Sequence, residues 1–227
     1  LDGTKTHKWV LEGLFGDCEQ VTKTDDLIKS GYLSKFRIKI LLCKHAPQHF
    51  ESYHDEMDYI VEHRGRNNLI KNLVKDIKGN TLVLFNYIEK HGEPLLELIN
   101  NTIDPERKVF FVHGGTDVED REQVRQLTET ENNAVIIASY GTFSTGINIK
   151  RLHNIIFASP SKSRIRNLQS IGRVLRKGEG KDIATLYDIA DDIGGQNYTL
   201  RHLNERVNIY NEENFKYEVI KVNLRAN

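Results

Sequence analysis

The chain has 227 residues, and its 32 basic and 32 acidic side chains give a formal net charge of zero. No overall positive field favours nucleic acid, so any phosphate binding must come from local groups of residues. No apolar run approaches the roughly 20 residues that cross a bilayer, no secretory signal is present, and Cys18 and Cys43 have no metal-binding or redox spacing. We therefore expect a cytoplasmic protein of one large or two small domains, with reduced thiols and no membrane partner.

Residues 1–44 are the more irregular part of the sequence, and we expect them to form a connector or hinge that precedes a regular domain at 45–227. Short apolar runs recur along the chain, and most are apolar throughout rather than alternating. This pattern is typical of strands buried on both faces of a parallel sheet. The runs lie at 37–43, 81–85, 108–113, 133–139, 154–159 and 183–189, and an alternating run at 216–224 predicts an edge strand.

Helical patterns lie between these runs, at 59–77, 88–101, 117–129 and 197–210, with a further helix around 168–176. Strands that alternate with helices predict an α/β fold with a doubly wound parallel sheet. Ligands of such sheets bind outside the carboxyl ends of the strands. The residues that directly follow each strand are therefore the first candidates for a functional site.

Small, glycine-bearing and hydroxyl-bearing residues collect at this edge. Asn86 follows the run at 81–85, and two glycines follow the run at 108–113. The stretch SYGTFSTGIN begins at residue 139, and SPSKSR at 159–164 leads into the helix around 168–176. Backbone N–H groups and hydroxyls of this kind can hold phosphate. The sequence therefore predicts a phosphate-facing edge.

The stretch LQSIGRVLR (168–176) places Gln169, Arg173 and Arg176 on one helix face, with Gly172 at its border. A glycine costs roughly 1 kcal/mol against alanine in a helix, which makes sense where another group approaches the backbone closely. A solvated basic face is the alternative interpretation. Because the helix starts from the phosphate-facing edge, we favour arginines that reach a phosphate.

A nucleotide-binding P-loop has the pattern G-x-x-x-x-G-K-[ST], and the chain lacks it. RKGEGKD (176–182) contains Gly-Lys, but an aspartate follows where the pattern needs Ser or Thr, and the first glycine of the pattern is absent. Arginines that serve a phosphate bound elsewhere are arginine fingers, whose planar, permanently charged forks suit a γ-phosphoryl group. We therefore expect the arginines of the 168–176 helix to act on a nucleotide that another domain holds.

No metal site is predicted. YHDEMDY (53–59) has the composition of an acidic magnesium motif, but no apolar strand precedes it, so we expect the solvated start of a helix. Four histidines are too loosely spaced to indicate a metal site, and three aspartates after a strand are expected to cap or solvate a turn. The histidines are His45, His49, His54 and His63, and the aspartates are Asp188, Asp191 and Asp192.

Four stretches resemble motifs of superfamily two helicases, in the order that this family has. QSIGRVLR (169–176) resembles motif VI, ASYGTFSTGINI (138–149) resembles motif V and TLVLFNYIEKHGEPL (81–95) resembles motif IV. VHGGTDVEDREQV (112–124) resembles the His-Gly and arginine-containing stretch that follows motif IV. Residues 11–40 are similar to the link between the two motor domains in the XPB and type III restriction branch, and the whole chain resembles phage helicases of recombination and repair.

The resemblance implies the second RecA-like domain of a DNA-dependent ATPase: a parallel sheet with helices on both faces and no P-loop of its own. ATP and Mg²⁺ would be held mainly by the first RecA-like domain of the same chain. Arg173 and Arg176 would be the catalytic arginine fingers, and Gln169 would couple the nucleotide to the domain interface. Gly146, Asn148 and Gly172 would line the nucleotide or the coupling path. The nucleic-acid contacts would be Asn86, His113, Gly114, Ser139, Tyr140, Thr142, Lys162 and Arg164.

These implications predict the C-terminal motor half of an ATP-dependent DNA helicase or branch-migration translocase in recombination and repair. Branched or forked DNA would be its substrate, recombination proteins would be further partners, and the host cytoplasm would be its location if a phage encodes it. Alone, these residues are expected to be inactive. The alternatives are a non-catalytic RecA-like nucleic-acid-binding adaptor, a restriction-enzyme motor or an RNA helicase, and the residues by themselves do not separate DNA from RNA.

Overall fold

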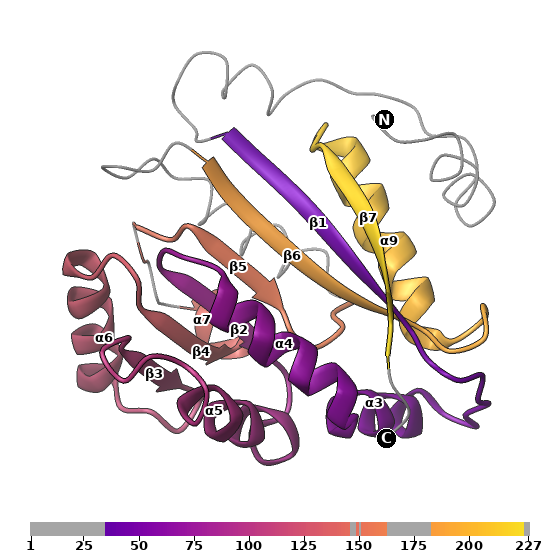
Figure 1. Cartoon of the computed structure of the whole chain (residues 1–227), viewed down its shortest axis with the longest axis horizontal. Coiled ribbons are helices and arrows are strands. Elements are labelled where there is room, and N and C mark those ends of the chain that lie inside the picture. The colour runs from indigo at the N-terminus through magenta and orange to yellow at the C-terminus, as the bar shows by residue number, and fades with distance from the viewer. Residues whose placement is uncertain (1–34, 146–148, 150, 163–182, 225–227) are drawn as a thin grey trace.

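A seven-stranded sheet forms the centre of the computed structural model (Figure 1), which describes residues 35–145, 149, 151–162 and 183–224. The strand order is β3-β4-β2-β5-β6-β1-β7, and every pair of neighbours is parallel. The strands are β1 (Lys35–Lys44), β2 (Thr81–Phe85), β3 (Val109–Val112), β4 (Val135–Ser139), β5 (Asn154–Phe157), β6 (Ile183–Asp192) and β7 (Tyr217–Asn223).

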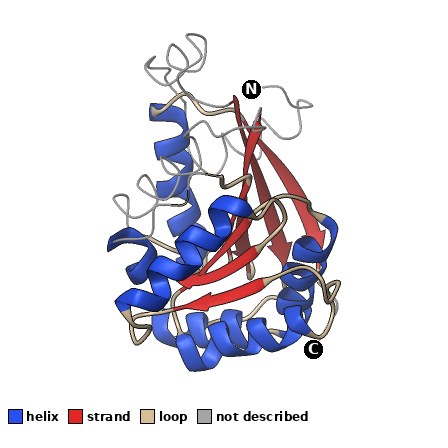
Figure 2. Ribbon diagram, turned by 90° about the vertical axis from the view of Figure 1, so that its left-hand side faces the viewer, coloured by secondary structure: helices blue, strands red, loops and turns tan. Residues whose placement is uncertain are grey.

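Helices cover both faces of the sheet, which confirms the predicted doubly wound α/β fold (Figure 2). On one face lie α4 (Arg64–Asp76) and α5 (Glu93–Asn100), and on the other lie α6 (Val118–Thr130), α7 (Tyr140–Thr145) and α9 (Tyr198–Glu212). The remaining described helices are α3 (Tyr53–Glu62) and the π-helical turn η1 (Ile88–Gly92). Among the residues that the structure describes, no helix has the length and apolar character needed to cross a membrane.

Burial on both faces explains why the strand sequences are continuously apolar. In β2, all five residues are buried; Leu82 and Leu84 pack on the α9 side, whereas Val83 and Phe85 pack on the α4 and α5 side. Successive side chains of a strand point to opposite faces, so a strand covered by helices twice needs apolar residues at every position. Most of the predicted runs therefore coincide with the observed strands.

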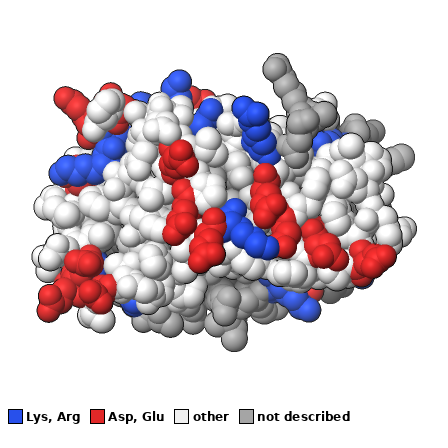
Figure 3. Space-filling view, turned by 90° about the horizontal axis from the view of Figure 1, so that it is seen from below, with Lys and Arg blue, Asp and Glu red and all other residues white. Residues whose placement is uncertain are grey.

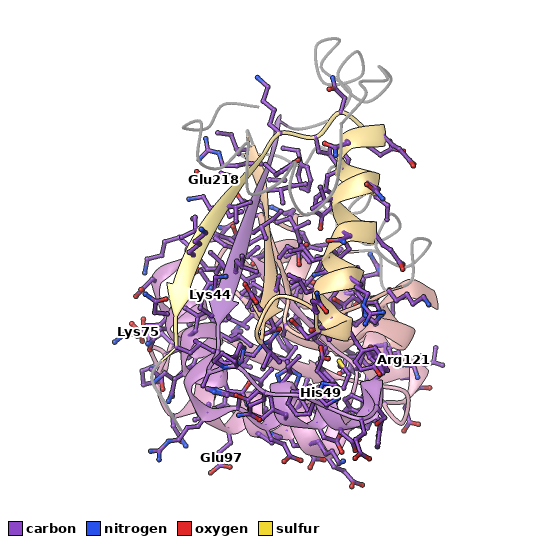
Figure 4. All side chains as sticks on the ribbon, turned by 90° about the vertical axis from the view of Figure 1, so that its right-hand side faces the viewer. Lys44, His49, Lys75, Glu97, Arg121 and Glu218 are labelled. Atoms are coloured by element: carbon purple, nitrogen blue, oxygen red, sulfur yellow. The ribbon has the colours of Figure 1, made fainter. Side chains whose placement is uncertain are left out.

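The predicted connector at 1–44 includes one strand of the sheet. Residues 35–44 form β1, which pairs along its whole length with β6 and also pairs with the edge strand β7. The sheet thus includes residues that we had assigned to the connector, while residues 1–34 lie outside the described residues. The alternating run at 216–224 does form the edge strand, β7, and Figure 4 shows its Glu218 beside the strand that carries Lys44.

One predicted helix at 59–77 is two helices in the structure. The chain leaves the helical conformation at His63, which ends α3 and begins α4. The His63 Nδ1 atom accepts a hydrogen bond from the backbone N–H of Arg66 at 3.2 Å, as an N-cap side chain does. The helix break turns α4 onto the sheet and carries Arg66 into the interior, where it is fully buried.

Two of the three aspartates of β6 are buried partners of arginines rather than solvated turn residues. Asp191 Oδ1 accepts from Arg66 Nε and lies against His45 Nε2, both at 2.8 Å. The Asp188 carboxylate accepts from Arg206 Nε at 3.1 and 2.8 Å. Only Asp192 has the predicted turn role, which it fills by accepting from two backbone N–H groups of the following loop.

Glu56 likewise differs from its predicted place on a solvated helix face, because its side chain is buried against the start of α9. Its carboxylate accepts from the backbone N–H groups of Tyr198 at 2.8 Å and Thr199 at 2.7 Å, and from Asn197 Nδ2 at 3.0 Å. A carboxylate at this position satisfies the free N–H groups of the helix and complements its dipole. Glu56 is thus a cap supplied by a distant part of the sequence.

Candidate functional site

The carboxyl ends of β3, β4 and β2 meet in an open pocket of about 530 Å³. Five of the predicted nucleic-acid contacts line it, because these three strands are neighbours in the sheet although far apart in sequence. The lining residues are Phe85, Asn86, Ile88, Gly114, Arg121, Ser139, Tyr140, Gly141 and Thr142. The sequence prediction of a shared edge for these segments is therefore confirmed.

Residues of this pocket differ in what they offer a ligand. Asn86 and Gly114 are exposed, and Ser139 is half-buried. Tyr140 and Thr142 are buried, and the Tyr140 hydroxyl donates to the carbonyl oxygen of Ser159 at 3.1 Å. Burial also raises the pKa of Tyr140, so its hydroxyl stays protonated and serves as a donor. The Tyr140 side chain is therefore part of the interior, and the contact of this residue with nucleic acid stays a prediction.

Thr142 has a similar internal role at the start of α7. Its hydroxyl lies 2.8 Å from the Ser139 hydroxyl, and its backbone N–H donates to Ser139 Oγ at 3.3 Å. Ser139 thus satisfies a backbone N–H group at the beginning of this short helix. The buried Thr142 side chain is turned toward Ser139, so Ser139 is the more accessible of the two hydroxyls.

The loop after β3 is held in shape by His113 and Arg121. His113 Nδ1 accepts from the Gly115 N–H at 3.1 Å, and the His113 N–H donates to Thr116 Oγ1 at 3.0 Å. Arg121 of α6 donates from Nε to the Thr116 carbonyl at 2.8 Å and from Nη2 to the Gly114 carbonyl at 3.1 Å. His113 does not line the pocket; its ring shapes the loop that presents Gly114.

Arg121 is a candidate that the sequence-based list of site residues omits. It lies in the stretch that resembles the family's arginine-containing region, and this was the signal that could have identified it. In Figure 4, Arg121 lies on the side of the molecule opposite Lys75. Its guanidinium donates to the carbonyls of Thr116 and Gly114, and Arg121 also lines the pocket. Arg121 therefore holds the Gly114 loop in place and supplies positive charge to the pocket.

The remaining predicted residues are divided between the surface and the undescribed segments. Lys162 is exposed at the end of the described segment after β5, and it is not among the residues that line the pocket. The other predictions lie outside the described residues and stay predictions: Gly146, Asn148, Arg164, Gln169, Gly172, Arg173 and Arg176.

Another face of the molecule is unfavourable for phosphate. Figure 3, which views the molecule from below, shows Asp and Glu side chains in a band that is broken by few Lys and Arg. The elements at the bottom of Figure 1 are α3 and α5, with η1 leading into α5. Their exposed acidic residues include Asp55, Glu62, Glu89, Glu93 and Glu97. Repulsion between like charges directs a nucleic-acid backbone away from this surface.

His91 links α4 and the end of β2 to Ser159, which follows β5. Asn67 Nδ2 donates to the Val61 carbonyl, so its Oδ1 accepts from His91 Nε2 at 3.1 Å. His91 Nδ1 then accepts from the Ser159 hydroxyl at 2.8 Å. Ser159 Oγ in turn accepts from the Asn86 N–H at 3.1 Å. This chain of hydrogen bonds requires neutral His91, and burial lowers the pKa of His91 to about 3.

His91 is expected to make folding sensitive to acid. Between pH 3 and 6.5 the unfolded histidine binds a proton and the folded one does not, so stability is complete above about pH 6.5 and falls as the pH drops toward 3. The slope contributed by this residue is about 1.4 kcal/mol per pH unit. Denaturant unfolding at several pH values should show a shallower dependence for His91→Gln than for the native chain. Equal slopes in the two proteins would contradict this assignment.

Metal ligands are not gathered in the described part of the chain, where no group of three or more His, Cys, Asp or Glu residues is arranged to hold an ion. Of the β6 aspartates, Asp188 accepts hydrogen bonds from Arg206. Asp191 accepts from Arg66 and lies against His45.

The comparison with known families places this edge in context. Residues 65–178, half of the chain, match the family described as the helicase conserved C-terminal domain. The chain belongs to this helicase family. The matched residues include the carboxyl ends of β2, β3, β4 and β5, and so the whole candidate pocket. The resemblance inferred from four sequence motifs is thereby confirmed.

Individual relatives agree with the family. The chain is 34% identical over 234 residues to the ATP-dependent DNA helicase uvsW of Enterobacteria phage T4, covering 93% of this chain and 46% of that protein. The crystal structure of T4 UvsW is similar with a TM-score of 0.68 and 33% identity, over 84% of this chain and 42% of that one. The chain thus spans about half the length of this curated relative.

More distant structures share the fold alone. A DEAD box protein from Methanococcus jannaschii is similar with a TM-score of 0.53 and 16% identity, over 86% of this chain and 43% of that chain. These likenesses to helicase domains confirm the predicted RecA-like sheet with helices on both faces. A fold shared at this level carries no function by itself, so function must be argued from the site.

Proposed function

We propose that this chain is the C-terminal motor half of an ATP-dependent DNA helicase or branch-migration translocase that acts in recombination and repair. The observation that carries the proposal is the 34% identity to phage T4 uvsW over nearly the whole chain, together with the pocket at the carboxyl edge. A phage relative favours action in the cytoplasm of a host cell, with branched or forked DNA as substrate and recombination proteins as further partners.

In this proposal the pocket holds the nucleic-acid backbone. Exposed Asn86 and Gly114 offer an amide and a backbone N–H, half-buried Ser139 offers a hydroxyl, and Arg121 adds positive charge. Groups of this kind bind phosphate and sugar oxygens, so the grip is largely independent of base sequence. Exposed Lys162, with Arg164 beyond the described residues, would extend the positive path after β5.

ATP and Mg²⁺ belong to the same proposal, with a first RecA-like domain as their main holder. This chain contributes the arginines of the 169–176 motif. When bound, ATP would supply the free energy that drives movement along DNA. From this chain, Arg173 and Arg176 would stabilise phosphoryl charge, Gln169 would couple the domains, and Gly146, Asn148 and Gly172 would line the nucleotide or the coupling path.

Gly114 provides a test of the pocket that leaves the fold intact. A Cβ atom built at Gly114 meets no described atom within 4 Å, so Gly114→Ala should leave the melting temperature unchanged. If DNA phosphate approaches this backbone, the added methyl group should weaken binding by about fivefold, which corresponds to one hydrogen bond of about 1 kcal/mol. Fluorescence anisotropy with labelled DNA measures the effect. The control is Glu97→Ala, which changes an exposed side chain of α5 outside the pocket. Native affinity for Gly114→Ala would remove this loop from the DNA contact.

The proposed function itself is tested by strand release from forked DNA and by movement of a four-way junction. The full-length protein that carries this chain should perform both only with ATP and Mg²⁺, and a matched RNA duplex shows whether the nucleic acid must be DNA. A protein that binds the fork but releases no strand and moves no junction would instead be the adaptor.

A further inference from the structure

The four residues 158–161, which we call the anchor segment, are held in an unusual way. They follow β5 and precede the stretch that contains Gln169, Arg173 and Arg176. Each of their four consecutive carbonyl oxygens accepts a hydrogen bond from a side chain of a different part of the fold. The donors are Arg66 Nη1 to Ala158 O (2.6 Å), Tyr140 hydroxyl to Ser159 O (3.1 Å), Asn86 Nδ2 to Pro160 O (3.1 Å) and Arg206 Nη1 to Ser161 O (3.2 Å).

The two arginine donors are themselves fixed by buried carboxylates. Arg66 of α4 donates from Nε to Asp191, and Arg206 of α9 donates from Nε to both oxygens of Asp188. The side chains of both pairs are essentially inaccessible to solvent. A guanidinium that is held by a carboxylate through one nitrogen and donates through another has little freedom to move. The two ends of the anchor segment are therefore tied to opposite faces of the sheet.

The middle of the anchor segment is fixed through its side chain as well. Ser159 is fully buried, and its hydroxyl takes part in the His91 hydrogen-bond chain described above. Asn86 contacts the segment twice, with its backbone N–H on Ser159 Oγ and its side chain on the Pro160 carbonyl. The anchor segment thus receives polar contacts from α4, η1, α7, α9 and the end of β2.

Stability alone does not require this arrangement. A buried ion pair must overcome the loss of hydration of both charges. Apolar residues of similar volume at the same positions often stabilise a fold equally well. A set of directed contacts does, however, restrict a chain to one position and direction. Gln169 lies only eight positions after Ser161 in the sequence, so the anchor segment sets where the stretch that follows begins.

We propose that Arg66, His91 and Arg206 are positioning residues, which fix the place where the chain leaves the sheet toward Gln169, Arg173 and Arg176. This inference rests on the proposed function, in which those arginines act on a nucleotide. Arg66 and Arg206 touch neither the nucleotide nor DNA in this account, and they act on hydrolysis only through the anchor segment. Misplacement of a reacting group by about 1 Å can cost a factor of about 100 in rate.

The test is Arg206→Lys in the full-length protein, with Arg107→Lys as the matched control. Lysine keeps a positive charge near Asp188 but lacks the second nitrogen that reaches the Ser161 carbonyl. Arg107 is also a buried arginine that donates to backbone carbonyls, but its carbonyl partners are those of Asn133, Val74 and Gly79, outside the anchor segment. Both variants should lower the melting temperature. Only Arg206→Lys should lower the kcat of ATP hydrolysis, by about tenfold, at unchanged KM for ATP.

Equal kcat values for the two variants, or a native kcat for Arg206→Lys, would overturn the inference. If Arg206→Lys does not fold, Ser159→Ala replaces it, because this variant removes only a buried hydroxyl from the anchor segment. Its control is Thr128→Val, which removes a buried hydroxyl that donates to backbone carbonyls within α6. The same difference in kcat is expected, and its absence again overturns the inference.

A double-variant cycle with Arg176→Ala separates the inference from the proposed function. If the anchor segment acts through the arginines, Arg206→Lys should lower kcat in the native background and leave it unchanged in the Arg176→Ala background. Equal factors in both backgrounds would show that Arg206 acts by another route and would overturn the inference alone. Native turnover for Arg176→Ala itself would instead contradict the arginine-finger role on which the inference rests, while the motor-half proposal would still be tested by ATP hydrolysis and strand release.

Discussion

Replacing Arg176 by alanine is expected to lower DNA-stimulated ATP hydrolysis of the full-length protein by about 10³-fold or more, while DNA binding remains. The basis is the proposed finger role, in which a guanidinium stabilises charge on the transferred phosphoryl group and contributes a factor of about 10³–10⁵. Steady-state turnover with saturating DNA measures the loss, and anisotropy with labelled DNA checks binding.

Arg176→Lys is the matched control for the shape of the group, since lysine keeps the charge but not the planar fork. We expect it to recover only a small part of the native rate. Native turnover in Arg176→Ala would show that the motif has another role, and the basic face would then belong to solvent or to DNA.

The second large effect concerns stability. Asp188→Ala should lower the free energy of unfolding by about 3–5 kcal/mol, because it leaves the buried Arg206 charge without its carboxylate. It also removes the acceptor of the Tyr210 hydroxyl, which lies 2.6 Å from Asp188 Oδ2. Denaturant unfolding measures the change. Glu131→Ala, which removes a surface partner of Lys108, is the control and should cost about 0–1 kcal/mol. Similar values for both variants would contradict the importance assigned to the buried pair.

Sequence patterns predicted the sheet well where a strand is buried on both faces. Thr81–Phe85 is apolar along nearly its whole length and forms the buried β2, and the alternating run at 216–224 forms the edge strand β7. The predicted connector at 1–44 contains β1, which pairs with β6, a strand more than a hundred residues away in the sequence. Periodicity describes one segment at a time and contains no information on such distant pairing.

Polar residues were the harder part of the prediction. Glu56 was expected at the solvated start of a helix, and Asp188 and Asp191 were expected to cap or solvate a turn. Acidic residues are rarely buried without a partner. Glu56 and Asp191 have partners more than 120 residues away, on α9 and α4, and Asp188 pairs with Arg206 of α9, 18 residues away. Only the folded structure brings these groups together. A sequence that is met alone shows the charge of each residue but not which opposite charge or helix end it will reach.

The candidate site was predictable in its location and less so in its details. Parallel strands place their carboxyl ends at one edge, so Asn86, Gly114 and Ser139 were expected together and are found together. Tyr140 differs because α7 begins directly after β4 and turns its ring into the interior. Arg121 was omitted because its role depends on contacts with the Gly114 and Thr116 carbonyls, which the sequence does not show.

The most direct test of the whole account is the rate of ATP hydrolysis by the full-length protein, measured with and without forked DNA. The motor-half proposal predicts Mg²⁺-dependent hydrolysis that DNA increases by at least tenfold, and no hydrolysis by the 227-residue chain alone. DNA binding without any ATP hydrolysis by the full-length protein, or hydrolysis that DNA leaves unchanged, would contradict it.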